Sequence, residues 1–438
     1  MARLLILFIF LCSTTAFAES NWPQFRGSNH DYLSDAKGLP TEWSADSNIK
    51  WKTPIEGRGW ASPVVWENKV FIATAVREAE GTDTAPPANY RSGRVGKTSI
   101  LRWELHCLDI ETGNLLWKQV AFKGNPRIRT HPKNTFASET PATDGKHVYV
   151  YFGMIGLFCY DMDGKLIWQK DLGGYEMLGD WGTSSSPILH DGKLYLQIDN
   201  EENAFLTAMD PKDGEELWRV QRNPGSSWGS PMVWKNKSRT ELVTNSEDVR
   251  SYDPATGKLL WSLRYPGGRA SSSPTGTADA LFVGNEARRD GGGVMYAVLP
   301  GASGDITPDN GQTTSDGVLW TVTDASPEFT SPLILDDQIY LFGRNRGFVG
   351  VFDPKTGARL PGIGRLPGAR PFWSSSWTAD GKVFCTDERG QTFIVTGGAE
   401  VKHVGTNTLG EPVYASPALI DGAIILRSEN AVYRIESE

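Results

Sequence analysis

The stretch that decides the fold runs from Ser186 to Leu196 and has the sequence SPILHDGKLYL. Its apolar pair Ile188-Leu189 is followed by the turn pair Asp191-Gly192 and then by a second apolar segment. An Asp-Gly pair between two short segments rich in apolar residues is typical of a tight β-hairpin. The stretch therefore predicts two antiparallel strands joined by a turn.

The same pattern recurs along the chain, with a serine or threonine and usually a proline before each apolar strand. The eight copies begin at Ser62, Thr140, Ser186, Ser230, Ser273, Ser331, Ser375 and Ser416. From Thr140 onward the steps between copies are 46, 44, 43, 58, 44 and 41 residues. This period is typical of a four-stranded propeller blade. We therefore predict an all-β, eight-bladed β-propeller of four-stranded antiparallel blades.

A second turn closes many of the copies, as in Asp210-Pro-Lys-Asp213-Gly214, and a tryptophan follows it on the next predicted strand. The tryptophans of this kind are Trp117, Trp168, Trp218, Trp261 and Trp320. A large ring near the outer strand of each blade can seal the gap to its neighbour. We predict this structural role for them and no role in ligand binding.

The two ends of the repeat region complement each other. The last copy has room for only three strands, and the segment Ile49–Thr53 before the first copy carries the missing tryptophan-bearing strand. Pairing of the two ends would remove an exposed sheet edge. We therefore predict one propeller over residues 49–438, closed by its N-terminal strand.

The N-terminus has the features of an export signal. Arg3 precedes an apolar run from Leu4 to Leu11, and Ala16-Phe17-Ala18 has the form of a cleavage site. We predict a cleaved signal peptide over residues 1–18, an N-terminal extension over residues 19–48, and a periplasmic or secreted protein. No later apolar stretch has the length of a transmembrane segment.

Composition excludes some functions. The formal net charge of -8 makes the chain a poor nucleic-acid binder. Cys107, Cys159 and Cys385 follow the signal, and an odd number cannot form a complete disulfide framework. We expect buried free thiols and a monomeric protein.

Two segments interrupt the period, residues 76–102 in the first copy and residues 300–317 in the fifth. Both are polar and rich in turn-forming residues, so we predict surface loops. The acidic pairs Glu201-Glu202 and Glu247-Asp248 also fall between predicted strands, where solvated charges are commoner than catalytic ones.

An aromatic pattern precedes the repeat serines. Two residues before them stand Trp60, Trp228, Phe329, Trp373 and Tyr414, whereas the other three copies have Ser138, Ser184 and Ser271. If each serine opens the innermost strand of its blade, propeller symmetry places all eight positions on one ring at the mouth of the channel. Arg58, Arg269 and Arg370 lie close before three of the serines and could border this ring.

Aromatic faces beside guanidinium groups suit sugar rings, peptides and anions. We interpret these eight aromatic and arginine residues as a candidate ligand-binding site. The alternative is that the rings fill the channel and pack the inner strands.

The repeated Asp-x-x-Thr-Gly turn with its downstream tryptophan resembles the pyrroloquinoline-quinone-like repeat family, including propellers similar to the outer-membrane assembly lipoprotein. The opening Trp22-Pro23-Gln24-Phe25-Arg26-Gly27 resembles exported propellers abundant in planctomycetes. The resemblance implies the propeller fold, and it covers nearly the whole mature chain. It leaves the function open, because one fold hosts many functions.

Quinone-dependent enzymes of this kind often carry adjacent cysteines, and this chain has no Cys-Cys pair. No paired zinc-ligand spacing, nucleophile elbow or phosphate-binding loop is present. We therefore predict no catalytic residue, no metal site and no cofactor, and we expect a noncatalytic propeller that binds a protein, peptide or glycan on its loop face. The alternative is an oxidoreductase with pyrroloquinoline quinone and calcium in the channel.

Overall fold

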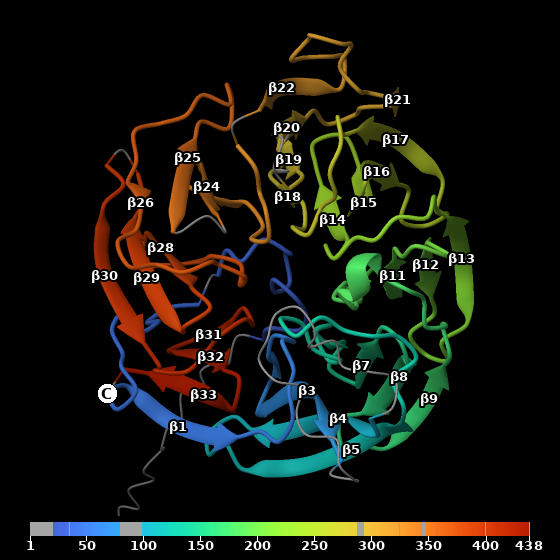
Figure 1. The fold of residues 1–438 in the computed structure, drawn as a ribbon, viewed down its shortest axis with the longest axis vertical. Helices are drawn as coiled ribbons and strands as arrows, with labels where there is room; N and C mark the ends of the chain where they lie inside the picture. Colours follow the sequence, from blue (N-terminus) through green and yellow to red (C-terminus); the bar gives the residue numbers. More distant parts are fainter. Residues whose placement is uncertain are drawn as a thin grey trace, which may run out of the picture.

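The computed structural model describes residues 21–34, 36–78, 99–286, 293–323, 325–343, 347–398 and 400–437. These residues form eight antiparallel sheets arranged as a ring around a central channel (Figure 1). The predicted eight-bladed, four-stranded propeller is thereby confirmed. The predicted signal peptide and residues 79–98 of the first insertion lie outside the described residues.

The two inner strands of each blade follow the repeat serine. The innermost strands are β2 (Val64–Trp66), β6 (Ala142–Thr143), β10 (Ile188–His190), β14 (Met232–Lys235), β18 (Thr275–Gly276), β23 (Leu333–Leu335), β27 (Trp377–Ala379) and β31 (Ala418–Ile420). The second strands are β3 (Lys69–Arg77), β7 (His147–Phe152), β11 (Lys193–Ile198), β15 (Thr240–Asn245), β19 (Leu281–Gly284), β24 (Gln338–Phe342), β28 (Lys382–Thr386) and β32 (Ala423–Arg427).

The two outer strands complete each blade. The third strands are β4 (Leu101–Asp109), β8 (Gly156–Asp161), β12 (Phe205–Met209), β16 (Asp248–Tyr252), β20 (Met295–Val298), β25 (Phe348–Phe352), β29 (Gln391–Thr396) and β33 (Ala431–Glu436). The outermost strands are β5 (Leu115–Gly124), β9 (Leu166–Lys170), β13 (Glu216–Gln221), β17 (Leu259–Arg264), β22 (Val318–Val322), β26 (Gly364–Arg365), β30 (His403–Thr408) and β1 (Ile49–Pro54).

Burial follows the position of a strand in its blade. Middle strands such as β3 and β8 are buried along nearly their whole length, because neighbouring blades cover both faces. The outermost β5 has no buried residue and faces the rim. The hairpin turn at Asp191 and Gly192 has positive φ at both residues, 46° and 66°, as an Asp-Gly hairpin requires.

The N-terminal strand closes the ring. β1 pairs antiparallel with β33, with Lys52 opposite Tyr433 and Pro54 opposite Ala431, and the sheet order is β1-β33-β32-β31. Figure 1 shows β1 beside β33 at this junction. The predicted closure by residues 49–53 is confirmed, and it gives the last blade its fourth strand.

The outer-strand tryptophans dock on the next blade. Trp168 Nε1 donates to the Pro211 carbonyl at 2.9 Å, and its ring covers Gly214 in the turn of that blade. Trp117, Trp218 and Trp320 make the equivalent bond to the following blade. Trp261 differs, because its Nε1 donates to Glu241 of its own blade. The predicted sealing role holds for four of the five.

We expect Gly214→Ala to be more destabilising than Gly192→Ala. Both glycines have positive φ, 70° and 66°, so the backbone strain of about 1–2 kcal/mol is shared. A Cβ at Gly214 would lie 2.8 Å from the Trp168 ring, whereas one at Gly192 meets nothing within 4 Å. Overpacking should add about 1–3 kcal/mol at Gly214. Urea unfolding of the two variants measures this difference, and equal midpoints would contradict the docking role.

The second insertion is more than a surface loop. Within it, β21 (Gly304–Asp305) pairs parallel with β17 as a fifth strand of the neighbouring blade, with Gly304 opposite Trp261. Ile306 and Ala302 are buried there. The predicted surface loop over residues 300–317 is thus not loop throughout, because the exposed residues Gly304 and Asp305 form a strand on an otherwise unpaired sheet edge.

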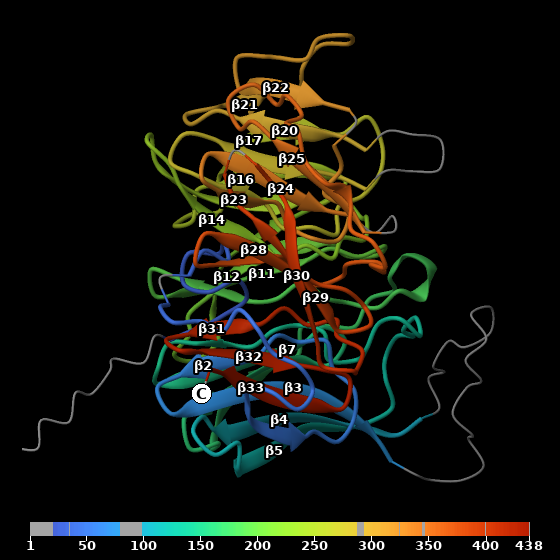
Figure 2. The same ribbon diagram turned by 90° about the vertical axis from the view of Figure 1, so that its left-hand side faces the viewer.

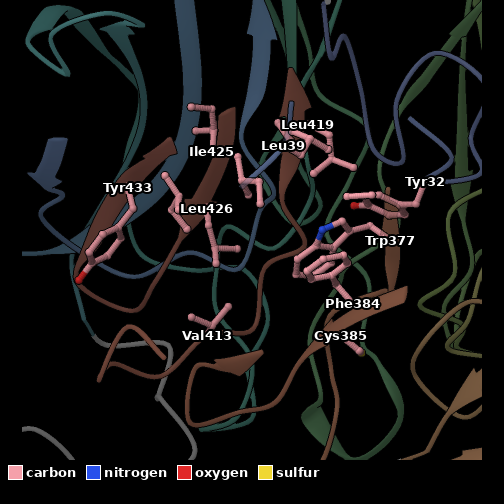
Figure 3. Packing of buried hydrophobic residues seen from close by; sticks show 14 of the residues in the cluster. Tyr32, Leu39, Trp377, Phe384, Cys385, Val413, Leu419, Ile425, Leu426 and Tyr433 are labelled. Atoms are coloured by element: carbon pink, nitrogen blue, oxygen red, sulfur yellow. The ribbon is translucent and has the colours of Figure 1, made fainter. Parts of the chain in front are cut away.

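The N-terminal extension crosses one end of the channel. Trp22 pairs with Val65 of the first blade, and Gln24 exchanges hydrogen bonds with the backbone of Leu189 in the third. Farther on, Tyr32 and Leu39 pack into the core of the last two blades, where Figure 3 shows Tyr32 close to Trp377. The N-terminal extension therefore contacts several blades at once.

The three cysteines of the described chain are buried free thiols, as predicted. Burial raises the pKa of Cys107 and that of Cys159 to about 12. Across the described ranges, the one helical element is the short 3-10 helix η1 (Leu178–Asp180), and no helix has the length and hydropathy needed to cross a bilayer.

Candidate functional site

The central channel contains a cavity of about 550 Å³. All eight positions two residues before the repeat serine or threonine line it: Trp60, Ser138, Ser184, Trp228, Ser271, Phe329, Trp373 and Tyr414. The structure therefore brings together the five aromatic side chains that the sequence singles out. Their ability to bind a ligand stays a prediction.

Four of these aromatic side chains form an arc of two stacked pairs joined by a tilted contact. Trp60 lies 4.3 Å from Tyr414 between ring centroids, and Phe329 lies 4.4 Å from Trp373, with interplanar angles of 22° and 9°. Trp373 and Tyr414 join the two pairs at 6.1 Å. The arc lines a cavity instead of filling the channel, so the space remains open to a ligand.

A loop between the second and third blades adds residues that sequence reasoning missed. Trp181 directly follows η1, stacks on His131 at 3.8 Å and approaches Trp373 at 6.5 Å. Trp228 Nε1 donates to the Gly182 carbonyl of the same loop at 2.8 Å. Figure 2 shows η1 projecting from one face of the ring. This loop therefore brings a sixth aromatic ring to the mouth.

Lys133 was also missed and lies at the centre of a charged cluster. Its Nζ is 3.1 Å from Glu388 Oε2 and 5.3 Å from the Trp373 ring centroid. Trp373 Nε1 donates to the same carboxylate oxygen at 2.9 Å. These bonds fix the plane of the Trp373 ring, so the ring is held in place before any ligand arrives.

The three predicted arginines have different positions. Arg269 lines the cavity and forms ion pairs with Glu201 at 2.7 Å and Glu247 at 3.2 Å. Arg58 lies outside the cavity lining, with its guanidinium 5.2 Å from the Trp60 ring. Arg370 is exposed and, like Arg58, is not among the residues that line the cavity, and a role for either arginine in ligand binding stays a prediction. It stands five residues before its serine, whereas Arg58 and Arg269 stand four residues before theirs.

Below the aromatic positions lies a ring of hydroxyl groups. The serine or threonine of one blade accepts a hydrogen bond from the backbone N–H of the preceding one at six of the eight steps, over 2.8–3.1 Å. All eight of these residues line the cavity. The repeat serine thus fastens neighbouring blades and also supplies the polar wall of the channel.

The N-terminal extension forms the floor. Phe25 lines the cavity, and the buried Arg26 donates to the Pro274 carbonyl and to Thr275 Oγ1, both at 2.5 Å. These acceptors directly follow the hydroxyl ring in sequence, whereas the aromatic positions precede it. Mouth, hydroxyl ring and floor are therefore successive layers along one axis.

A family model described as outer membrane protein assembly factor BamB matches residues 102–361. The chain belongs to this family. No curated protein matches the sequence.

Solved structures similar to this BamB-family chain fall into more than one functional class. BamB from Moraxella catarrhalis is 12% identical with a TM-score of 0.51, over 82% of this chain and 98% of that chain. Quinohemoprotein alcohol dehydrogenases from Comamonas testosteroni and Pseudomonas putida HK5 are 12% identical, with TM-scores of 0.59 and 0.61. They cover 96% and 95% of this chain and 81% and 80% of their own. Such likeness establishes the fold, not the ligand.

The donor set of the cavity does not fit a calcium-bound quinone. Calcium takes six to eight oxygen ligands, commonly with several carboxylates. Glu286 is the one carboxylate among the described lining residues, and these ranges hold no cluster of three or more His, Cys, Asp or Glu side chains able to bind a metal. A step through calcium therefore has no residues to carry it here.

One buried carboxyl group lies beside the cavity. Glu139 stands between the lining residues Ser138 and Thr140 and is 1% exposed. Its Oε1 has no hydrogen-bond partner in the described structure. Burial raises the pKa of Glu139 to about 7, against the opposing effect of hydrogen bonds from Thr183 and from the backbone.

We therefore expect stability to fall as the pH rises from about 4.5 to about 7. In this pH window the folded protein keeps a proton on Glu139 that the unfolded chain has lost. Above pH 7 both states have lost this proton, so the contribution of Glu139 to the free energy of unfolding no longer changes with pH. The loss should be about 3 kcal/mol. Glu139→Gln should remove this slope and be more stable than the parent at pH 8, whereas the exposed Glu215→Gln should not. Urea unfolding at pH 5 and pH 8 tests this, and an unchanged slope in Glu139→Gln would contradict it.

Proposed function

We propose that this protein is an exported, noncatalytic binding propeller that takes part of a protein, peptide or glycan into the cavity at its channel mouth. One observation carries the proposal: an aromatic arc lines an open cavity of about 550 Å³ in the channel. That volume falls in the usual range of ligand sites. Export rests on the N-terminal sequence and on the family.

The layered geometry supports binding from one side. Because the N-terminal extension floors the cavity, a ligand would enter past Trp181 and Trp228 and would not pass through the ring. Flat aromatic faces supply most of the contact area, and hydroxyl groups supply the polar contacts. The charged groups at the mouth are neutralised in pairs, such as Lys133 with Glu388 and Arg269 with Glu201.

Calorimetric titration tests the proposal against the oxidoreductase alternative. The mature protein is titrated with a panel of glycans and peptides, and separately with pyrroloquinoline quinone plus calcium. We expect a response to a glycan or peptide and no dye-linked alcohol oxidation. Tight quinone binding accompanied by such oxidation would overturn the proposal.

Trp60→Ala should weaken binding of the responding ligand at least about tenfold, since a stacking aromatic ring contributes about 1 kcal/mol or more in addition to its buried area. Trp66 in the same blade is the matched control, because it is also partly exposed but does not line the cavity. Trp66→Ala should leave the affinity unchanged, whatever its effect on stability. Equal affinity losses in the two variants would argue against binding in the cavity.

A further inference from the structure

The hydroxyl ring has an unused hydrogen-bonding capacity. In the bonds that the structure gives them, Thr140, Ser186, Ser230, Ser273 and Ser331 act as acceptors of a backbone N–H from the preceding blade. A hydroxyl can also donate one hydrogen bond. No described residue accepts from these five, whereas Ser62 and Ser416 lie beside the Tyr32 hydroxyl. Five consecutive blades thus present an arc of O–H donors to one cavity.

A buried positive charge adjoins this arc. Arg26 is 2% exposed, and its guanidinium donates to the Thr275 hydroxyl and to the carbonyls of Pro274 and Pro332, which directly follow ring residues. It also lies 6.0 Å from the centroid of the Tyr32 ring. Its Nε has no partner, and no described carboxylate forms an ion pair with it. A buried cation is costly unless an anion compensates it. Burial accordingly lowers the pKa of Arg26 to about 10, opposed by the field of Asp31.

Two acidic groups lie at the mouth of the cavity, whereas Glu139, which adjoins the ring residue Thr140, is buried, and burial favours its neutral form by raising its pKa to about 7. Glu286 accepts from Ser271, a mouth position, and Glu388 accepts from Trp373, also at the mouth. The deeper layer holds hydroxyl donors and the neighbouring guanidinium. A ligand with an anionic end and a ring-shaped body matches both layers, with the anion deep and the body among the aromatic rings.

We propose that the hydroxyl arc binds the carboxylate of an acidic sugar whose ring stacks on the aromatic side chains of the mouth. This inference rests on the proposed binding function and names its ligand class. A sugar is favoured over a peptide because the cavity wall is rich in aromatic rings and hydroxyl groups, and Leu178 is its one aliphatic apolar side chain among the described residues. Charge-assisted hydrogen bonds from several hydroxyls would select the charged sugar over its neutral analogue.

The test compares glucuronate with glucose, which lacks the carboxylate, by calorimetry and tryptophan fluorescence. We expect glucuronate to bind at least about tenfold more tightly. Ser230→Ala should weaken glucuronate binding by about tenfold and glucose binding less. Ser230→Thr should keep the parent affinity for glucuronate, because threonine retains the hydroxyl and Thr140 already occupies the equivalent position in another blade. Ser376→Ala is the control, because this buried hydroxyl adjoins the ring without lining the cavity.

Three other results would contradict the proposal. Equal affinity for both sugars, lost in Trp60→Ala, would overturn the carboxylate site and leave the proposed binding function standing. Binding of acetyl-Gly-Gly as the free acid but not as the amide, without glucuronate binding, would overturn the sugar assignment in favour of a peptide end. Absence of any sugar or peptide response would overturn both proposals. Thermal unfolding of each variant separates loss of a contact from loss of the fold.

Discussion

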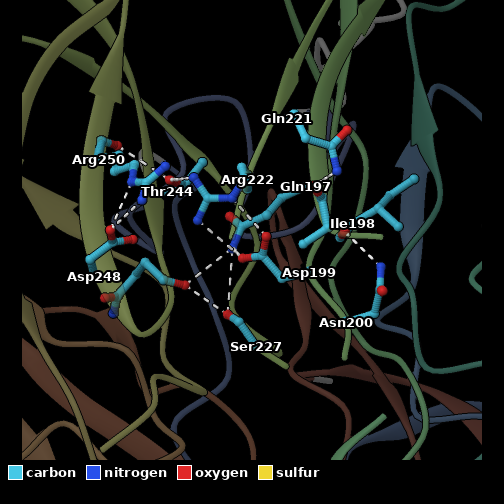
Figure 4. A network of polar contacts seen from close by, with 12 residues as sticks. Gln197, Ile198, Asp199, Asn200, Gln221, Arg222, Ser227, Thr244, Asp248 and Arg250 are labelled. Atoms are coloured by element: carbon cyan, nitrogen blue, oxygen red, sulfur yellow. Dashed lines mark hydrogen bonds and ion pairs between the residues drawn. The ribbon is translucent and has the colours of Figure 1, made fainter. Parts of the chain in front are cut away.

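Replacing Arg222 with alanine should lower the free energy of unfolding by about 3–5 kcal/mol. Arg222 Nε lies 2.7 Å from Asp199 Oδ1, and both side chains are at most 2% exposed. Its Nη1 also donates to Thr244 in the next blade (Figure 4). The same Nη1 donates to the Tyr252 hydroxyl of that blade. Removal of the guanidinium would leave a buried carboxylate without its counter-ion and would break a link between two blades.

Unfolding in guanidinium chloride, followed by far-UV circular dichroism, measures this loss of unfolding free energy. The control is Arg250→Ala, which removes an ion pair to Asp248 of the same length, 2.7 Å, in a more exposed setting. That change should cost less than about 1 kcal/mol. The double variant Asp199→Asn with Arg222→Met should be more stable than Arg222→Ala alone, because it leaves no unpaired charge. Similar losses in Arg222→Ala and Arg250→Ala would contradict a buried link.

Trp51→Ala should be comparably destabilising, by about 3–5 kcal/mol. Trp51 lies on the closing strand β1, donates through Nε1 to the Ile110 carbonyl at 2.8 Å and covers Gly113 of the first blade. It is 9% exposed. The change would therefore open a cavity at the junction where the chain ends meet, so both closure of the last blade and its docking on the first should weaken.

Trp51→Phe is the matched control, because it keeps a ring over Gly113 and loses one hydrogen bond, at a cost of about 1 kcal/mol plus the smaller packing area. Hydrogen exchange localises the effect. We expect faster exchange in β33, whose N–H groups pair with β1, than in β12 on the far side of the ring. Uniform exchange rates in the two strands would show that β1 is not the weak point of closure.

The fold was predictable because similar short sequence motifs recur from blade to blade. A serine or threonine followed by an apolar segment recurs in all eight copies, and an Asp-Gly turn and an outer-strand tryptophan recur in several of them, so the repeat identifies the blades. Trp261 does not dock on the next blade as the other outer-strand tryptophans do, because β21 covers the edge of its strand. Parallel pairing between a polar insertion and a neighbouring blade depends on tertiary position, and no local signal marks it.

The part of the candidate site that belongs to the repeat was predictable for the same reason. Trp60, Trp228, Phe329, Trp373 and Tyr414 occupy an equivalent position in the repeat, so symmetry places them together. Trp181, Lys133 and Phe25 lie in loops or in the N-terminal extension, where no repeat position applies. Proximity in sequence to the repeat serine does not fix the direction of a loop side chain, so Arg269 lines the cavity whereas Arg58 and Arg370 do not.

The most direct test is a crystal structure of the mature protein with the ligand that binds most tightly in the titrations. The account predicts ligand density inside the channel cavity, in contact with Trp373 and Trp60, with its polar end directed toward the hydroxyl ring. Density only on the outer rim, or a channel filled by the aromatic side chains themselves, would contradict the claim that this cavity is the binding site.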